Sequence, residues 1–337
     1  METDSETLLK NTSRSLYLSI QALPRHMREP FAIAYLLCRY ADTIADTRLL
    51  PAEKRSGWIE KFPQLVQQQP PREVQALTRE ISGKSENKYE EELIKNLPLC
   101  LAQFNVLADD LKPLVAEVVQ AVCEGMKIDL SFFPTEKNAP VKAFEKAAHL
   151  EHYCRLMGGK PGLFWSKLTQ KTIPHFAPNE MFLQWGQQIG DALQIVNILR
   201  DLPKDLQLGR CYFPTEDLQP AGLTPDDLRQ AQNSARFEPV KQKWIRWGMD
   251  RLAAAAPYFS NLPKMQPGQR AAVAWPILWT ADTLYKVAQT PDLLDVQKRV
   301  KIPRSTIYFT LACTPALWLS NTFFATWLAR KINRFSK

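Results

Sequence analysis

Apolar residues recur every three to four positions along most of the chain, which is the spacing of one face of an α-helix. Polar, proline-containing segments such as residues 134–140 separate these stretches. No segment alternates between apolar and polar residues in the way that predicts β-strands between helices. The pattern therefore predicts an all-α bundle, with helices over residues 12–24, 30–50, 111–128, 141–157, 178–202, 224–260 and 268–290.

Some helix boundaries depend on single residues. Thr12 or Ser13 can begin the first helix, because either hydroxyl can cap the amides of a first helical turn. Pro30 suits the first turn of the next helix, where a backbone N–H is not needed. Pro203 lacks the N–H that a helix interior uses, so we expect the helix over residues 178–202 to kink or end there.

Two of the predicted helices end in acidic pairs. "YADTIADT" contains Asp42 and Asp46, and "NILRDLPKDLQLGR" contains Asp201 and Asp205. Residues four apart share a helix face, where two like charges repel each other. One such pair is common on a solvent-facing helix, but two pairs accompanied by arginines indicate a site for hard cations. Since Mg²⁺ binds carboxylates together with substrate phosphates, we expect magnesium between the two helices and a diphosphate bound to it.

Composition excludes some classes of function. The 337 residues are 45% hydrophobic and include only 12 glycines, which favours a large helical core. The net charge is +8, but the basic residues are scattered, so we expect no nucleic-acid partner. The six cysteines form no CxxC and mostly lie in apolar patterns, and the acidic N-terminus is unlike a signal peptide. These features predict a cytoplasmic protein.

Three segments resemble the signature blocks of the squalene and phytoene synthase family, and most of all those of squalene synthases. "TSRSLYLSIQALPRHMREPFAIAYLLCRYADTIADT" is similar to the first block, "EHYCRLMGG" to the tyrosine block, and "QIVNILRDLPKDLQLGRCYFP" to the second aspartate block. Their order and spacing match over residues 10–300. The resemblance implies an isoprenoid-synthase-like, single-domain bundle with a central active-site cavity over residues 1–300, followed by a C-terminal segment over residues 301–337.

The resemblance also implies roles for single residues. The family's catalytic tyrosine falls on Tyr153. Magnesium would be held by Asp42, Asp46, Asn197, Asp201 and Asp205. The substrate diphosphates would contact Ser13, Arg14, Arg39, Gln194, Asn197, Arg200 and Arg210. The chain departs from the family at Pro203, inside the second pair, and at Lys204, where an acid is common, so a metal role is better supported for Asp201 than for Asp205.

The implied reaction joins two molecules of farnesyl diphosphate head to head. Magnesium and arginines would stabilise the first leaving diphosphate, and the second substrate would attack the allylic cation to give a cyclopropyl diphosphate. Tyr153 or the released diphosphate would accept a proton, and NADPH would then reduce the rearranged cation. No GxGxxG follows a strand, so NADPH rests on the resemblance alone. The alternatives are a dehydrosqualene, hydroxysqualene or phytoene synthase, and, more remotely, a non-catalytic membrane adaptor.

Shielding such a cation from water needs apolar and aromatic walls. Candidates for these walls are Phe31, Phe164, Trp165, Phe182 and Trp185, although each also suits an ordinary helical core.

Residues 306–328 carry no charge and contain Pro315. As one helix they would span about 35 Å, which is enough for a bilayer core. Two alternatives remain open: an apolar face that docks on the fold and on a membrane surface, and a helix that spans the membrane. Either alternative predicts a membrane-associated protein, which we expect to be a monomer.

Overall fold

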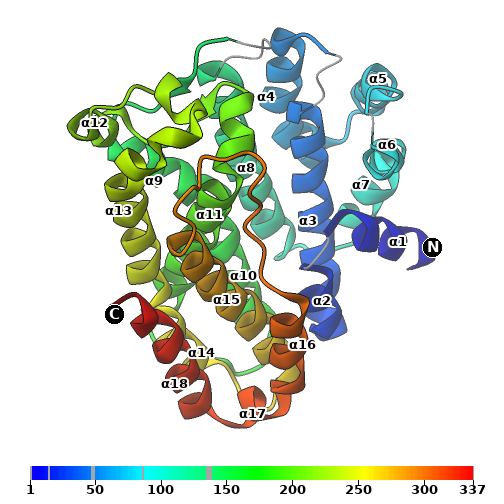
Figure 1. The fold of residues 1–337 in the computed structure, drawn as a ribbon. Helices are drawn as coiled ribbons and strands as arrows, with labels where there is room; N and C mark the ends of the chain where they lie inside the picture. The colour runs from blue at the N-terminus through cyan, green and yellow to red at the C-terminus, as the bar shows by residue number, and fades with distance from the viewer. Residues whose placement is uncertain (1, 14–15, 47–49, 86, 134–138, 337) are drawn as a thin grey trace. The chain divides into compact units, whose positions relative to one another are not determined.

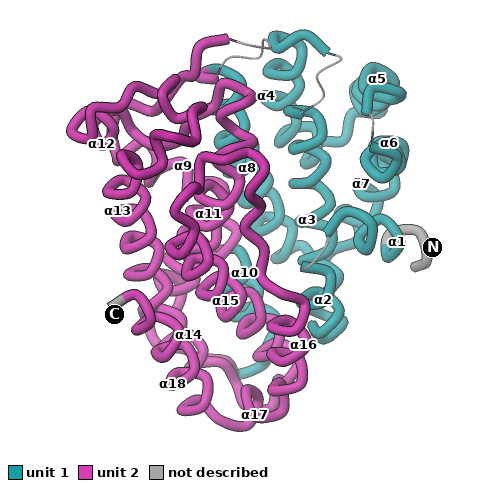
Figure 2. The backbone as a smooth tube through the Cα atoms, viewed as in Figure 1, with its two compact units in different colours: residues 1–131, 164–175 teal, residues 132–163, 176–337 magenta. Residues whose placement is uncertain are grey.

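Helices make up most of the described part of the chain, with two short strands beside them, which confirms the all-α prediction (Figure 1). The computed structural model describes residues 2–336 except 14–15, 47–49, 86 and 134–138. The chain divides into two compact units (Figure 2): unit 1 comprises residues 1–131 and 164–175, and unit 2 comprises residues 132–163 and 176–337. Both units are therefore discontinuous in sequence.

Unit 1 is built around α3 (Arg25–Asp46), which carries the first aspartate motif. Leu36, Tyr40 and Ile44 lie on its buried face, and α4, α6 and α7 pack against it. Tyr40 stacks on Phe62 of α4 with ring centroids 5.5 Å apart. The other helices that begin in unit 1 are α1 (Glu2–Ser13), α2 (Leu16–Ala22), α4 (Ala52–Gln68), α5 (Pro71–Ile81), α6 (Lys88–Lys95), α7 (Leu97–Asn105) and α8 (Lys112–Phe132).

Unit 2 is built around α11 (Phe182–Gln207), which carries the second aspartate motif. Helices α13 and α15 and a π-helix (Arg155–Gly159) pack against α11, and Ile195 and Leu199 are fully buried there. Strands β1 (Lys142–Ala143) and β2 (Arg210–Cys211) pair in parallel. The other helices are α9 (Ala147–Cys154), α10 (Lys160–Thr172), α12 (Thr215–Leu218), α13 (Ser234–Leu252), α14 (Ala255–Asn261), α15 (Pro267–Ala288), α16 (Arg304–Ala312), α17 (Thr314–Leu319) and α18 (Asn321–Ile332), with short 3₁₀ turns at Gln219–Ala221, Asp226–Arg229, Ala231–Asn233 and Asn333–Ser336.

Glycines bring the segment from the π-helix to the start of α10 into backbone contact with α11. A Cβ added to Gly158 would lie well inside 3.0 Å of the Gly190 carbonyl oxygen, and one added to Gly190 would meet the Gly158 carbonyl in the same way. Gly162 makes an equivalent approach to Gly186. Because the obstructing atoms belong to the backbone, no side-chain movement could make room for a larger residue. The separation of the two segments is therefore fixed by main-chain contact.

The predicted start of the first helix is wrong. Thr12 and Ser13 end α1, and their hydroxyls donate to the backbone carbonyls four residues earlier, at 2.7 and 2.5 Å. A Ser or Thr hydroxyl can hydrogen-bond to a carbonyl of its own helix as readily as it can cap the start of the next helix. Helix α3 also begins earlier than expected, at Arg25, so Pro30 lies inside the helix. The fully buried Met27 extends the apolar face of α3 upstream of that proline.

Of the two expectations for Pro203, an end to the helix is wrong. Helix α11 continues through Pro203 to Gln207. A proline inside a helix costs about 3 kcal/mol, because it removes a hydrogen bond and crowds the preceding turn. Leu202, Pro203 and Leu206 are all buried in unit 2, and this packing offsets the loss. Both aspartates of the second motif therefore remain one turn apart on one helix.

Residues 306–328 are divided among three helices. Pro315 lies in the first turn of α17, and the Ser320 side chain caps α18 by accepting a hydrogen bond from the Phe323 amide at 3.0 Å. No helix in the described residues is both long enough and apolar enough to cross a bilayer. The unbroken helix that the spanning alternative requires is therefore not formed.

The C-terminal helices belong to the core of unit 2. Lys331 of α18 is buried and pairs with both carboxylate oxygens of Asp282 on α15, at 2.5 and 2.6 Å. The fully buried Arg270 of α15 donates, over 2.6–3.2 Å, to the backbone carbonyls of Phe259, Leu262 and Trp318 and to the side chain of Asn321. A buried guanidinium needs such partners, so these bonds fasten α17 and α18 to α14 and α15.

The glycine contact generates a prediction about stability. Gly190→Ala should lower the free energy of unfolding by about 1–3 kcal/mol, because the new methyl group meets a backbone oxygen that cannot move aside. Gly57→Ala is the matched control: Gly57 lies inside α4 with nothing within 4 Å of an added Cβ, so this change should raise stability by about 0.5–1 kcal/mol. Denaturant unfolding measures both values, and a Gly190→Ala protein as stable as the wild type would contradict the backbone contact.

Candidate active site

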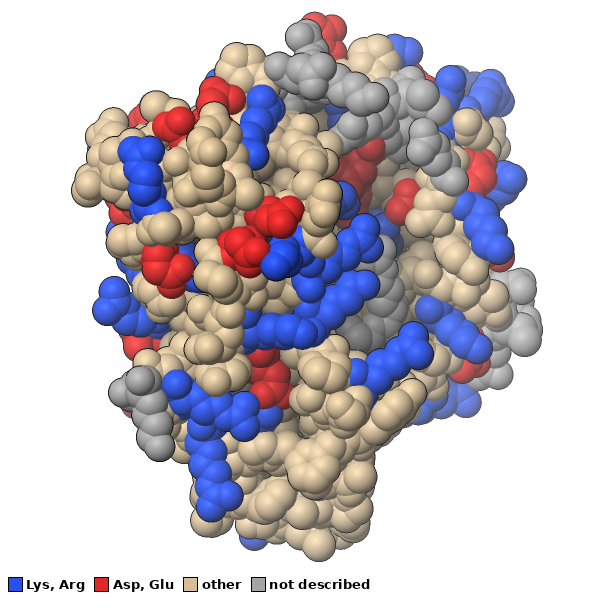
Figure 3. All heavy atoms as spheres, in the orientation of Figure 1, with Lys and Arg blue, Asp and Glu red and all other residues tan. Residues whose placement is uncertain are grey.

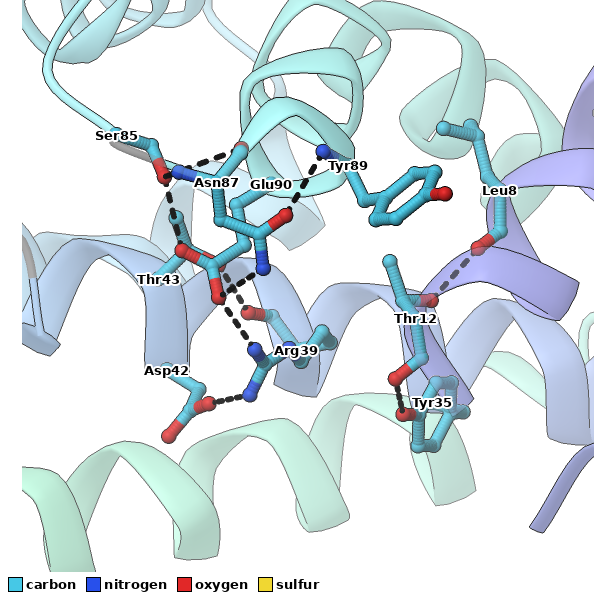
Figure 4. Close-up of polar contacts among 10 residues, drawn as sticks. All are labelled: Leu8, Thr12, Tyr35, Arg39, Asp42, Thr43, Ser85, Asn87, Tyr89 and Glu90. Carbon is cyan, nitrogen blue, oxygen red and sulfur yellow. Dashed lines mark hydrogen bonds and ion pairs between the residues drawn. The ribbon is translucent and has the colours of Figure 1, made fainter. Parts of the chain in front are cut away.

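The first aspartate motif lies at the C-terminal end of α3, and its arginine is held from two sides (Figure 4). Arg39 pairs with Asp42 one turn further on and, at 2.7 Å, with Glu90 of α6. Glu90 also accepts hydrogen bonds from Ser85 at 2.9 Å and from Asn87 at 3.3 Å. The side chains of Ser85 and Asn87, just before α6, thus orient Glu90, and Glu90 orients the guanidinium of Arg39.

Asp42 lies among acidic groups of unit 1. Restricted access to water raises its pKa, the neighbouring Asp46 carboxylate raises it further, and Arg39 acts in the opposite direction. Glu90 and Asp129 add weaker repulsion. Carboxylates outnumber cations in this group, so a divalent cation with oxygen ligands would relieve the repulsion. The first motif therefore has the excess negative charge that a magnesium ion would neutralise.

The end of α1 lies beside the first motif. The Tyr35 hydroxyl of α3 donates to the Thr12 carbonyl at 2.8 Å, which holds α1 against α3 (Figure 4). Ser13 is buried, and its hydroxyl is used by the backbone of its own helix. Arg14, which the family resemblance assigns to substrate binding, lies outside the described residues.

The second aspartate motif lies in the last two turns of α11. Arg200 donates two hydrogen bonds to Asp201, at 3.0 and 2.6 Å, and this bonding raises the pKa of the guanidinium. Asn197 is exposed one turn earlier, and Gln194 is partly exposed. After α11, Gly209 adopts a left-handed conformation with φ of 76°, which favours glycine, and turns the chain into β2 with Arg210.

Tyr153 lies in the last turn of α9, buried among aromatic rings. It stacks on Tyr212 with ring centroids 4.8 Å apart, and the two hydroxyl oxygens are 3.4 Å apart. Phe144 lies 6.0 Å from the Tyr153 ring and Phe133 lies 5.0 Å from the Tyr212 ring. The surroundings of the hydroxyl pair are therefore largely apolar. The sequence alone assigned Tyr212 no role, because it lies 59 positions after Tyr153 and no local spacing pattern connects the two.

An ion cluster surrounds the buried Asp191 and includes Arg155, two residues after Tyr153. Asp191 of α11 is 1% exposed and faces Arg155 of the π-helix at 3.3 Å and Arg251 of α13 at 3.8 Å. Burial raises the pKa of Asp191 to about 6, although both arginines lower it. Its Oδ1 occupies the space that a side chain on Gly159 would need. The cluster joins the π-helix, α11 and α13, and no motif in the sequence indicated it.

Comparison with known proteins shows the family of the chain. The sequence pattern of the squalene/phytoene synthase family matches residues 9–306. The chain belongs to this family. The family comprises head-to-head prenyl transferases.

The curated relatives within the squalene/phytoene synthase family are diverse. A bifunctional lycopene cyclase/phytoene synthase of Colletotrichum graminicola is 27% identical over 77% of this chain, and the squalene synthase of Schizosaccharomyces pombe is 24% identical over 87%. A presqualene diphosphate synthase of Rhodopseudomonas palustris is 25% identical over 74% of this chain and 76% of its own length. The matches span only 42% of the Colletotrichum protein and 61% of the yeast one. The product is therefore not determined by similarity.

A solved ligand complex of TcSQS has the same fold. It superposes with a TM-score of 0.76 over 98% of this chain and 95% of its own, at 19% identity. A dehydrosqualene synthase complex gives a TM-score of 0.63 over 94% of this chain, at 20% identity. The all-α architecture is thus shared with both of these solved structures.

The squalene/phytoene synthase motifs are divided between the two units. The first aspartate pair lies in unit 1, whereas Tyr153 and the second pair lie in unit 2. Within the described residues, no three His, Cys, Asp or Glu side chains already form a metal-binding group. Joint binding of magnesium by both motifs therefore stays a prediction.

The candidate wall residues fall into two groups. In unit 1, Phe31 stacks on Phe164 at 6.1 Å and meets Trp165 edge-on at 4.8 Å, so these three rings form one cluster. In unit 2, Phe182 is fully buried against Tyr258 at 4.3 Å, as expected of an ordinary core aromatic.

Proposed function

We propose that the protein is a squalene synthase, which condenses two farnesyl diphosphates head to head through presqualene diphosphate to squalene. The observation that carries the proposal is a duplicated pairing of arginine with a motif aspartate: Arg39 with Asp42 in unit 1, and Arg200 with Asp201 in unit 2. Each pair offers a cation for a diphosphate oxygen and a carboxylate for a metal. Ionisation of a diphosphate needs both functions, and the chain supplies two copies of each.

The charged residues would act on the first leaving diphosphate. Arg39 and Arg200 would neutralise its developing negative charge, and we assign Arg210, Ser13 and Arg14 to the same task on family likeness. Gln194 and Asn197 would orient the substrates by hydrogen bonds. Magnesium bound at Asp42, Asp46, Asn197, Asp201 and Asp205 would act as a Lewis acid towards the diphosphate oxygens.

Tyr153 would receive the proton that is lost when the cyclopropane ring closes. Two electrons of the second substrate's double bond form a bond to C1 of the first and leave a cation on the other alkene carbon. C1 then loses a proton, and the electron pair of that C–H bond closes the ring. The Tyr153 oxygen would take this proton and pass its own to the Tyr212 hydroxyl, 3.4 Å away, and finally to the released diphosphate. The surrounding aromatic rings would exclude water and stabilise the cation through their π-faces.

The remaining parts of the proposal rest on family likeness. NADPH would supply the hydride for the reductive step, and we assign no residues to it. The protein would be a cytoplasmic monomer associated with a membrane surface, which suits a hydrocarbon product. The presence of phytoene and presqualene diphosphate synthases among the relatives supports one alternative, an enzyme that omits the reductive step or uses longer chains.

Product analysis tests the proposal. The purified protein should convert farnesyl diphosphate and magnesium to squalene only when NADPH is present, as measured by gas chromatography with mass detection. A product that is unchanged by NADPH would rule out a squalene synthase and support the dehydrosqualene or hydroxysqualene alternative. Phytoene formed in parallel incubations with geranylgeranyl diphosphate would support the longer-chain alternative.

Asp42→Asn and Asp201→Asn should each abolish turnover. An amide is a poor substitute for a carboxylate ligand of Mg²⁺, so several kcal/mol of transition-state stabilisation should be lost, or about 100-fold or more in kcat/KM. Because α11 continues through Pro203, Asp205→Asn should cause a comparable loss. Asp250→Asn, an exposed change on α13, is the control and should be neutral. Near-normal rates for the motif variants at saturating magnesium would refute the metal assignment.

Tyr153→Phe should fold normally but form no presqualene diphosphate. Phenylalanine retains the stacked ring, so the midpoint of thermal unfolding should change little, while the hydroxyl that receives the proton is lost. Tyr212→Phe should slow the reaction less, because it removes only the relay. Tyr285→Phe on α15 serves as a control for the loss of a phenol elsewhere in unit 2. Wild-type amounts of intermediate from Tyr153→Phe would exclude this role.

A further inference from the structure

Large apolar side chains are concentrated at the end of unit 2 that α16, α17 and α18 form. Ten large hydrophobic side chains are exposed in the described part of the chain, and five of them lie here. We call this group the C-terminal patch; it consists of Met265, Tyr308, Phe309, Leu319 and Phe323. Met265 is 85% exposed, and Tyr308, Phe309 and Leu319 are each 62–65% exposed. Single exposed hydrophobics are ordinary, whereas a group of this kind marks an interaction surface.

The C-terminal patch is continuous across several elements. Phe309 of α16 and Phe323 of α18 both pack on Trp327, with ring centroids 5.7 and 5.6 Å away. The indole N–H of Trp318 on α17 donates to the Lys264 carbonyl at 2.6 Å, and Met265 is the next residue. The three C-terminal helices and the turn between α14 and α15 therefore contribute to one surface.

Packing of α17 and α18 against unit 2 keeps the side chains of the C-terminal patch exposed to solvent. The opposite faces of α17 and α18 bury Leu317, Phe324 and Leu328 almost completely in unit 2. Arg270 and the Lys331–Asp282 pair fasten the same helices through buried polar bonds. Rotating a helix to hide its exposed aromatics would break these bonds and expose its buried leucines. The exposed rings are thus a fixed feature of unit 2.

Charge around the C-terminal patch favours an anionic partner. Lys264, Arg304 and Arg330 are exposed on the same elements, and residues 301–337 contain no acidic residue. Figure 3 shows this end of the molecule as mostly uncharged, with Lys and Arg at its margins. Lys331 does not add to this surface charge, because it is buried and paired. Aromatic and aliphatic side chains next to basic ones are typical of surfaces that enter the headgroup region of an anionic bilayer.

We propose that the C-terminal patch docks on an anionic lipid bilayer and enters its headgroup region without crossing it. The aromatic and aliphatic side chains would displace water from the acyl boundary, while the three basic residues contact lipid phosphates. The proposal identifies the surface behind the membrane association included in the proposed function. It does not depend on which prenyl product the protein makes, so vesicle binding and product analysis can fail separately.

Co-sedimentation of the full chain with vesicles tests the proposal. Binding should be strong to vesicles with phosphatidylglycerol in phosphatidylcholine and weak to pure phosphatidylcholine. Phe309→Ser with Leu319→Ser should weaken binding about tenfold or more, because two apolar side chains no longer leave water. Val106→Ser, a control 83% exposed in unit 1, should bind as the wild type does. Circular dichroism melting verifies that each variant is folded, and Phe309→Tyr is a milder substitute if the double variant unfolds.

Charge and self-association complete the test. Arg304→Glu with Arg330→Glu should also weaken binding, and 1 M salt should release the wild-type protein, since surface charges are screened within about 3 Å at that ionic strength. The proposal would be overturned if the wild-type protein did not bind anionic vesicles. It would also be overturned if Val106→Ser weakened vesicle binding as much as Phe309→Ser with Leu319→Ser does. A dimer in light scattering that Phe309→Ser with Leu319→Ser dissociates would also overturn it, because a second copy would then occupy the patch.

Discussion

The backbone contact between Gly158 and Gly190 sets the geometry of unit 2. It fixes the distance between α11, which carries the second aspartate motif, and the segment that follows Tyr153. The segment forms a π-helix at this point, a rare conformation that occurs often at functional sites. Asp191 lies over Gly159, next to the contact, and joins the segment to α11 by an ion pair. The position of the Tyr153 ring relative to the second motif therefore depends on Gly158 and Gly190 having no side chains.

Both aspartate motifs show the same electrostatic compromise. Each collects carboxylates that repel one another, and each engages one of them with an arginine of the same helix, Arg39 or Arg200. In unit 1 the remaining repulsion raises the pKa of Asp42. A ligand that relieves repulsion present in the folded protein stabilises the fold as it binds. Stronger repulsion between the carboxylates therefore makes the site bind cations more tightly and makes the protein without cations less stable.

Local sequence patterns predicted most of the helices, because a helix face is a local property. The expected single helix over residues 224–260 is wrong: 3₁₀ turns precede two helices there, α13 and α14. Local patterns failed where tertiary packing decided the outcome. An end of α11 at Pro203 was one of two expected outcomes, yet burial on both sides of the proline sustains the helix to Gln207. Tyr212 and Asp191 were not predicted as partners of Tyr153 and Arg155, since each contact joins residues far apart in sequence. Only the folded chain reveals such pairs.

The discontinuous units constrain the order in which the chain can fold during synthesis. Unit 1 includes residues 164–175, so it cannot be completed until a part of unit 2 has already been translated. Unit 2 buries Asp282 against Lys331, so its core waits for α18. Domains usually fold one after another as they leave the ribosome. Here neither unit can finish early, so partly made chains would keep apolar helices exposed until α18 has been translated.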